Sequence, residues 1–287
     1  MARWTLDKPD RLTLDGELSR LDISLIGGRL NVVGLTGPDA GPPQVQVTAI
    51  GRKPLIVSHE DGVLSIHHER PSTLPGFLWW ILGVNRWYRV DVSVAVPREA
   101  AASLRMIAGS VVASGLTGGT HADVTSGRMT LLGLAGRTTA RVISGPIEAL
   151  GIDGDLTLET VSGEITLADS PAHRVHAKAI SGSITCDLDN PHHSEIRLET
   201  TSGEITVRVR EDSDLDVWLN AISGHLTTAF PGLVASDLRG SNRTVTGKLG
   251  AGTGKLRAHA ISGHVALLRR DVEPDEPAEP AAEEEGR

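Results

Sequence analysis

Cysteine, aromatic side chains and long apolar runs are all scarce in this chain of 287 residues. The single cysteine, Cys186, excludes a disulfide within the chain, so cysteine usage gives no sign of secretion. No run of about 18 apolar residues is present, and the first ten residues lack the apolar segment of a signal peptide. We therefore expect a cytoplasmic protein without a membrane-spanning helix.

A basic surface is also lacking. The net charge is −8, but residues 271–287 hold eight acidic residues and one arginine (net −7), which leaves −8 − (−7) = −1 for residues 1–270. A nearly neutral body without a basic stripe argues against a nucleic-acid partner. Because residues 271–287 are rich in Pro, Glu and Ala, we expect them to form a disordered acidic tail.

Glycine, by contrast, is abundant, and much of it belongs to one repeated phrase, Ser-Gly preceded by Ile, Val or Thr. Ala108 replaces the serine in the first copy and Thr246 replaces it in a later one. Successive glycines are 16 to 23 residues apart, which is the period of a stacked repeat. The nine glycines are Gly109, Gly127, Gly145, Gly163, Gly182, Gly203, Gly224, Gly247 and Gly263.

Apolar residues hold fixed places around each copy: four positions before the serine, and three and five positions after it. The period-2 alternation changes phase at Ser-Gly, which indicates two short strands meeting at a corner. Glycine is expected there because a Cβ would obstruct the backbone. The sequence therefore predicts an all-β fold, a single-stranded β-solenoid over 101–270 with rungs of about 18–21 residues.

Residues 1–100 are predicted to form an N-terminal β-strand region that precedes this array. Gly28 falls where Gly127 does when the two segments are aligned, so the array is expected to begin there in degenerate form. Large apolar residues occupy every second position from Tyr88 to Val96, which indicates a strand with one buried face.

Charge alternates in sign along one outward column of the predicted stack, three positions before the serine. In a parallel stack these side chains lie above one another, where opposite charges attract. Each exposed pair contributes about 0–1 kcal/mol, so we expect the column to determine which rung lies on which. In chain order the column is Arg105, Asp123, Arg141, Glu159, Lys178, Glu199, Asn220, Arg243 and His259.

Motifs for a catalytic nucleophile, a phosphate loop, a dinucleotide or a zinc ion are missing. Glu159 and Glu199 share a column, but Lys178 separates them, which is more typical of a charge ladder than of the acid–base pair of a β-helix carbohydrate-active enzyme. The sequence therefore predicts a protein that is not an enzyme and has no catalytic residue or cofactor.

Histidine and cysteine give no sign of a metal site either. His225 and His264 share a column, but Lys248 stands between them in chain order, so we expect the two rings about 10 Å apart. His192 and His193 lie in a predicted loop without a companion ligand at metal-binding spacing. Cys186 falls in an inward apolar column and is expected to be a core residue with an unreactive thiol.

The strongest functional signal is an apolar segment at 70–88 between two predicted strands. Six large apolar residues follow one another at 77–82, and arginines flank them with no acid from 70 to 90. The segment suits a cap over the solenoid, a contact with a protein partner, or a contact with an anionic membrane. The candidate contact residues are Arg70, Phe77, Leu78, Trp79, Trp80, Ile81, Leu82, Arg86, Trp87 and Arg89.

The repeated phrases at 125–265 and the segment Gly27-Gly-Arg-Leu-Asn-Val-Val-Gly resemble a family of bacterial β-strand-repeat proteins, the adhesin-type or "toastrack" domains. The resemblance covers roughly residues 20–270 and implies a β-solenoid fold. It also implies a place in envelope-stress modules, alongside membrane proteins of the phage-shock type. It supplies no catalytic residues.

These observations predict a non-enzymatic β-solenoid scaffold for protein binding or assembly. Its expected partners are another protein, a second copy, or an anionic membrane reached through 70–88 at the inner face. One alternative is a self-polymerising solenoid similar to the bactofilins, which would stack end to end. The other is the carbohydrate-active enzyme considered above.

Overall fold

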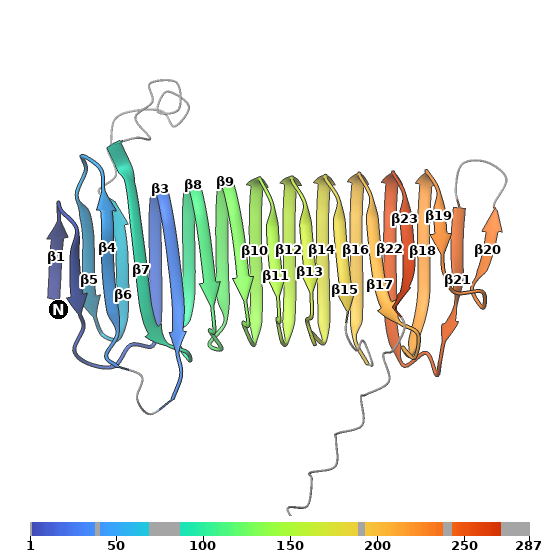
Figure 1. Ribbon diagram of the computed structural model, residues 1–287, viewed down its shortest axis with the longest axis horizontal. Helices are drawn as coiled ribbons and strands as arrows, with labels where there is room; N and C mark the ends of the chain where they lie inside the picture. Colours follow the sequence, from blue (N-terminus) through green and yellow to red (C-terminus); the bar gives the residue numbers. More distant parts are fainter. Residues whose placement is uncertain (1, 38–40, 69–86, 189–192, 238–242, 271–287) are drawn as a thin grey trace, which may run out of the picture.

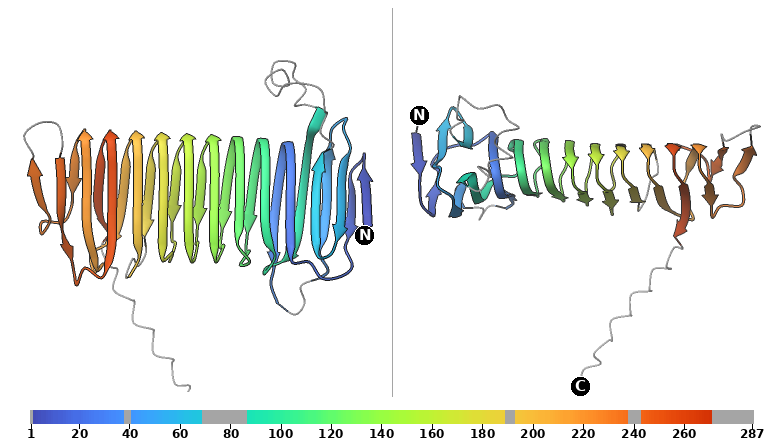
Figure 2. Two further views of the ribbon diagram at one scale, coloured as in Figure 1. Left: turned by 180° about the vertical axis from the view of Figure 1, so that it is seen from behind. Right: turned by 90° about the horizontal axis from the view of Figure 1, so that it is seen from above.

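The computed structural model describes residues 2–37, 41–68, 87–188, 193–237 and 243–270. The fold is a flattened β-solenoid, a long stack in which most rungs contribute one strand to each of two facing layers (Figures 1 and 2). Across the described residues, no helix is both long and apolar enough to span a membrane. The predicted all-β solenoid is confirmed.

The strands fall into three groups along the chain. The N-terminal group is β1 (Ala2–Leu6), β2 (Asp10–Thr13), β3 (Arg20–Leu35), β4 (Gln44–Ile50), β5 (Leu55–Glu60), β6 (Val63–His68) and β7 (Arg89–Pro97). The central group is β8 (Ala101–Ser114), β9 (Thr120–Leu132), β10 (Arg137–Ser144), β11 (Ile147–Leu150), β12 (Asp155–Ser162), β13 (Ile165–Ala168), β14 (Arg174–Ser181), β15 (Ile184–Leu188), β16 (Glu195–Ser202) and β17 (Ile205–Arg210). The C-terminal group is β18 (Leu215–Ser223), β19 (Leu226–Thr228), β20 (Val234–Asp237), β21 (Arg243–Leu249), β22 (Gly254–Ser262) and β23 (Val265–Arg270).

The two layers differ in which side of the Ser-Gly corner they contain. Layer A holds the strands before the corner, and its central part runs through the first halves of β3, β8 and β9 and then β10, β12, β14 and β16. Layer B holds the strands after the corner, including β11, β13, β15 and β17. Neighbouring rungs pair in parallel and in register, so each sequence column becomes a line of side chains along the stack.

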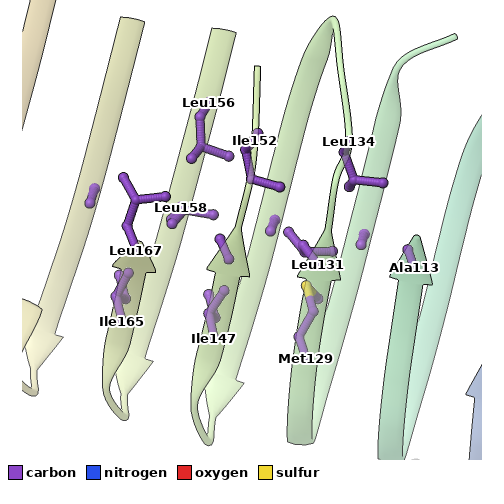
Figure 3. Close-up of a cluster of buried hydrophobic side chains, with 14 of the residues drawn as sticks. Ala113, Met129, Leu131, Leu134, Ile147, Ile152, Leu156, Leu158, Ile165 and Leu167 are labelled. Atoms are coloured by element: carbon purple, nitrogen blue, oxygen red, sulfur yellow. The ribbon is translucent and has the colours of Figure 1, made fainter. Parts of the chain in front are cut away.

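The core lies between the layers, where the predicted inward columns face each other. Ile147, Ile165, Ile184 and Ile205 follow one another in layer B and are at most 1% exposed. Figure 3 shows part of this core, with Leu158 of layer A beside Leu167 of layer B. Burying each large aliphatic side chain stabilises the fold by about 1.5–3 kcal/mol, so the core is built by many similar increments along the stack.

At the corners, glycine is stacked on glycine. A Cβ added to Gly145 would lie 1.8 Å from the carbonyl oxygen of Gly127, and one added to Gly182 would lie 1.8 Å from that of Gly163. The prediction that a Cβ would obstruct the corner is therefore correct, and the obstacle is the backbone of the adjacent rung. Eight of the nine predicted glycines belong to this line: Gly109, Gly127, Gly145, Gly163, Gly182, Gly203, Gly224 and Gly263.

The ninth predicted corner, Gly247, is wrong. It lies in β21, which runs antiparallel to β18 in layer A and is not a rung. A Cβ on Gly247 would first meet the side chain of Leu233, at 2.8 Å, and not the backbone of a corner glycine. The local phrase matches the repeat, but the strand that carries it closes the end of layer A.

Stack order also differs from chain order near the C-terminus. The rung formed by β22 and β23 lies between the rung of β16 and β17 and the rung of β18 and β19 (Figure 1). At the other end of the stack, β3 supplies a complete rung of its own: its first half lies between β6 and β8, and its second half lies between β7 and β8.

Both ends of the stack are closed by short strands. Layer A ends in β1 and β20, and layer B ends in β2 and β19. Of these, β1, β2 and β20 pair antiparallel with their neighbours, and β19 is only three residues long. Short or reversed edge strands discourage the addition of a further rung.

Candidate binding surfaces

The predicted contact segment lies mostly outside the described residues: Arg70, Phe77, Leu78, Trp79, Trp80, Ile81, Leu82 and Arg86. Trp87 and Arg89 are described, and they stand where the chain enters β7. The Trp87 side chain is 45% exposed, and the guanidinium carbon of Arg52 lies 5.9 Å from its ring centroid, within cation–π range. An exposed tryptophan paired with a cation is thus present at the base of the segment.

A shallow hollow lies beside this base. It has a volume of about 400 Å³ and is lined by Gly27, Gly28, Arg29, Arg89, Ala108, Gly109 and Ser110. Arg29 and Arg89 supply its charge, and Asp91 lies opposite Arg29 in register on β7. Arg52 at the ring of Trp87 and the two arginines of the hollow give this part of the surface three cationic side chains.

An exposed and mostly apolar line follows the corner from the rung of β8 to the rung of β18, and we call it the corner ridge. Its members stand one position before the serine, on the outer face of layer A. The six apolar members are between 40% and 54% exposed. In stack order the ridge is Ile107, Thr125, Ile143, Val161, Ile180, Thr201, Ile261 and Ile222.

The predicted charge column is confirmed as a ladder from Arg105 to Glu199. Arg141 Nε lies 2.8 Å from Glu159 Oε2, and both side chains are partly exposed. The members after Glu199 were predicted in the wrong order. Because the rung of β22 and β23 is inserted, His259 follows Glu199, and Asn220 follows His259.

Arg243, also predicted in the column, lies elsewhere. It faces Ala221 across the antiparallel pair of β18 and β21, and its Nη1 donates to the carbonyl oxygen of Gly224 at 3.1 Å. His259 and Asn220 end the ladder with a contact of 2.9 Å between Nδ1 and Oδ1.

A second ladder of alternating charge, which sequence reasoning missed, runs four positions further from the corner. It contains Arg137, Asp155, Arg174, Glu195, Lys255 and Asp216 in stack order. Arg174 Nη1 lies 3.3 Å from Asp155 Oδ2, and its Nε lies 3.7 Å from Glu195 Oε2. The last two members are adjacent only in stack order, so the chain order hides the complete pattern.

The expected separation of His225 and His264 is also wrong. Their ring centroids are 5.1 Å apart with 30° between the ring planes, because their rungs are direct neighbours. They line a hollow of about 550 Å³ with Arg243, Ser223 and Ser262. Within the described residues, no group of three His, Cys, Asp or Glu side chains is placed to hold a metal ion.

Trp218, Arg257 and Arg197 form another cluster that the chain order hides. Arg257 faces Arg197 on one side and Trp218 on the other, on the outer face of layer A. The Trp218 ring lies 6.3 Å from the His259 ring, centroid to centroid. A hollow of about 260 Å³ lies over this cluster.

The carboxylates and the thiol that were considered for catalysis lie in the charge ladder and in the core. Lys178 lies between Glu159 and Glu199 in register, as expected, so these carboxylates belong to the ladder. Cys186 is 1% exposed, and burial raises the pKa of its thiol well above the usual range. The predicted core role of Cys186, with an unreactive thiol, fits this environment.

Comparisons with known proteins support the resemblance found in the sequence. A search of curated proteins gave no match. A candidate adhesin from Bacteroides fragilis NCTC 9343 is 11% identical, with 93% of this chain and 97% of that chain covered and a TM-score of 0.38. A candidate adhesin from Parabacteroides distasonis ATCC 8503 is 11% identical, with 94% and 97% covered and a TM-score of 0.35.

A candidate cell adhesion protein from Clostridium sporogenes ATCC 15579 is 9% identical, with 92% of this chain and 100% of that chain covered and a TM-score of 0.26. We base no inference on structural likeness at these scores. The family comparison is stronger, because the model described as Toastrack DUF4097 matches residues 47–268, well over half of the chain. The chain therefore belongs to the Toastrack DUF4097 family.

Proposed function

We propose that this protein is a non-enzymatic scaffold that binds a protein partner along the corner ridge. The observation that carries the proposal is a line of exposed side chains at the same position of eight successive rungs, six of which are apolar. Six Ile and Val side chains, each about half exposed, present roughly 400–500 Å² of apolar surface, a size that is often functional on a soluble protein. The ladders and the buried Cys186 are structural features, which favours a binding role over catalysis.

The fold itself does not require apolar residues on the ridge. Thr125 and Thr201 occupy the same position on their rungs and are exposed, so a polar β-branched side chain satisfies the backbone there. Isoleucine or valine at the other positions therefore favours burial of the ridge against a binding partner. Covering this surface would contribute roughly 10 kcal/mol before the cost of association is subtracted.

Site-specific photo-crosslinking in the producing cell tests this proposal. A photoreactive amino acid replaces Ile143 or Ile180 on the ridge, and Thr166 or Thr206 on the outer face of layer B serves as the matched control. We expect discrete protein adducts from the ridge positions and none from the control positions. Equal labelling from both faces, or no adduct from the ridge, would contradict the proposal.

A second candidate function is a peripheral contact with an anionic membrane, which would place the protein at the inner face of the membrane. It is favoured by the exposed Trp87 with Arg52 at its ring, and by Arg29 and Arg89 nearby. Such a surface suits the interface of an anionic bilayer. The link to envelope stress that the family resemblance implies remains a prediction.

Flotation with vesicles tests the membrane contact. Wild type is compared with Trp87→Ala and with Trp79→Ala/Trp80→Ala, on phosphatidylglycerol-containing and on purely zwitterionic vesicles. We expect wild type to float only with the anionic vesicles and the variants to remain in the soluble fraction. If wild type binds neither vesicle, the membrane contact is wrong.

A further inference from the structure

We infer that the protein partner of the corner ridge is a second copy of this chain. The two copies pack face to face through layer A, with their stacks running in opposite directions. This inference rests on the proposed function and names its partner. It is carried by the self-complementarity of two neighbouring columns on the outer face of layer A, the charge ladder and the corner ridge.

The charge ladder has six alternating members, on the rungs of β8, β9, β10, β12, β14 and β16. Consider a two-fold axis parallel to the strands that passes between β10 and β12. It places each column opposite itself in reverse order, so Arg141 of one copy faces Glu159 of the other. The outer pairs are Asp123 with Lys178 and Arg105 with Glu199. Every facing pair is of opposite charge.

The same axis brings the two ridges together. Ile143 of one copy then faces Val161 of the other at the centre, followed by Thr125 with Ile180 and Ile107 with Thr201. A shared symmetry element that matches both columns is what an isologous interface requires. A second copy in the parallel orientation would not reverse the ladder, so the alternation favours the antiparallel pair.

A hollow beside this axis provides room for the partner. It has a volume of about 250 Å³ and is lined by Arg141, Val142, Ile143, Glu159, Thr160, Val161, Lys178 and Ile180. Its lining combines the centre of the ridge with the centre of the ladder. The apolar side chains of the second copy would therefore meet a recess instead of a convex surface.

The contact area is sufficient for a stable dimer. Six rungs at about 4.8 Å and strands of eight residues at about 3.3 Å give a face of about 29 by 26 Å, or roughly 750 Å² per copy. The total of about 1,500 Å² lies within the range of specific interfaces. Figure 1 shows the rungs from β8 to β16 side by side in one even row, which suits such a contact.

The two columns contribute differently to the dimer. Ladder charges already have partners within their own chain, such as Arg141 with Glu159, so the second copy adds little affinity through them. They do oppose arrangements in which like charges would face each other, such as one with the two-fold axis passing through a rung. Affinity therefore comes from the ridge, and orientation comes from the ladder. We do not propose that copies stack end to end, because short strands close both ends of the stack.

A charge-swapped variant tests this geometry. It carries Arg105→Glu, Asp123→Lys, Arg141→Glu, Glu159→Lys, Lys178→Glu and Glu199→Lys in the full-length chain. Alternation within the chain is preserved, so the variant keeps its fold and can pair with itself. Against wild type, however, every facing pair becomes a pair of like charges.

Native mass spectrometry then measures pairing after wild type and a mass-tagged copy of the variant are incubated together. We expect each protein alone at twice the monomer mass of 30.3 kDa. In the mixture, mixed dimers should fall from the half expected of random pairing to below about a tenth. Mixed dimers at the random level, or wild type that stays monomeric, would overturn the inference.

A second pair of variants decides the question even if the charge-swapped chain does not fold. Ile143→Lys should raise the dimer dissociation constant at least tenfold in sedimentation experiments. Leu268→Lys, on an apolar residue 39% exposed outside the ridge, should leave that constant unchanged. Equal effects of both variants would argue against the ridge.

The two proposals fail in different ways. If the ridge crosslinks to another protein and gives no adduct at twice the chain mass, the dimer is wrong and the protein-binding scaffold stands. If the ridge gives no crosslink at all, both proposals are wrong.

Discussion

Two corner glycines, Gly145 and Gly182, and one glycine outside the corner line, Gly133, allow backbone strain and steric exclusion to be measured separately. Gly133 has φ +56° with nothing within 4 Å of an added Cβ, so Gly133→Ala tests backbone strain alone. A Cβ on Gly182 would lie 1.8 Å from the oxygen of Gly163, and the φ of Gly182 lies outside the left-handed region, so Gly182→Ala tests the contact alone. Gly145→Ala combines a φ of +133° with a contact of 1.8 Å.

The expected losses of unfolding free energy follow from these geometries. Gly133→Ala should cost about 1 kcal/mol, because the left-handed conformation penalises a Cβ while alanine restricts the unfolded chain. Gly182→Ala requires the rungs to move apart by more than 1 Å, judged from an ordinary contact distance of about 3.4 Å. That movement weakens hydrogen bonds between these two rungs, including the one from Gly163 N to Ser181 O at 3.2 Å. We expect a loss of about 3 kcal/mol or more.

Urea unfolding followed by circular dichroism measures the three variants against wild type. The expected order of destabilisation is Gly145→Ala, then Gly182→Ala, then Gly133→Ala. Equal losses for Gly133→Ala and Gly182→Ala would refute the reasoning, since the glycines would then serve backbone conformation alone. A normal unfolding midpoint for Gly182→Ala would show that the rungs can separate without cost.

Three further predictions concern single side chains. Burial, and secondarily His67, lowers the pKa of His68 to about 4, so this buried histidine is neutral in the folded protein. Because His68 of the unfolded chain takes up a proton at a higher pH, the free energy of unfolding should fall by up to about 3 kcal/mol as the pH drops from about 6.5 to about 4. In urea titrations at several pH values, His68→Phe should reduce this dependence of the unfolding free energy on pH. Cys186 should react with a thiol reagent only in denaturant, and fast labelling of the native protein would contradict its burial. Lys178→Glu places like charges on three successive rungs and should cost about 1 kcal/mol in low salt, with a smaller loss in 1 M NaCl; a loss independent of salt would point to packing instead.

Local patterns in the sequence predict the rungs well, because each column depends only on distance from a Ser-Gly corner. The inward position of Ile165 or Cys186 follows from alternation, and the ladder from Arg105 to Glu199 follows from chain order. The prediction fails at Gly247 and at the pair of His225 and His264. The sequence within a rung does not determine which rung it stacks on. An antiparallel strand or an inserted rung therefore cannot be recognised from the local sequence.

Much of the candidate site was accessible from the same pattern. Odd positions before the serine point outward, so the isoleucine of each Ile-Ser-Gly phrase is an outward apolar residue. The ridge could therefore have been found from a residue such as Ile143 alone. The cluster of Trp218 and Arg257 could not, since these residues become neighbours only through the stack order.

The inserted rung also has a consequence for biosynthesis. A ribosome releases the chain from its N-terminus, so the rungs up to β17 can add one after another as they emerge. The rung of β18 and β19 emerges next, but its parallel partner is β22, which is made later. Residues 215–228 must therefore wait for residues 254–270 before they join the stack.

The end of the stack that contains β18 to β23 is thus completed in one step, late in synthesis. A chain cut before residue 254 would leave β16 and β17 with an open parallel edge, because the rung of β22 and β23 that covers them would be missing. Such an edge is the form most prone to pairing with other chains. The order of strands in the stack therefore makes β22 and β23, which are synthesised after the strands they cover, the ones that protect the nascent chain from aggregation.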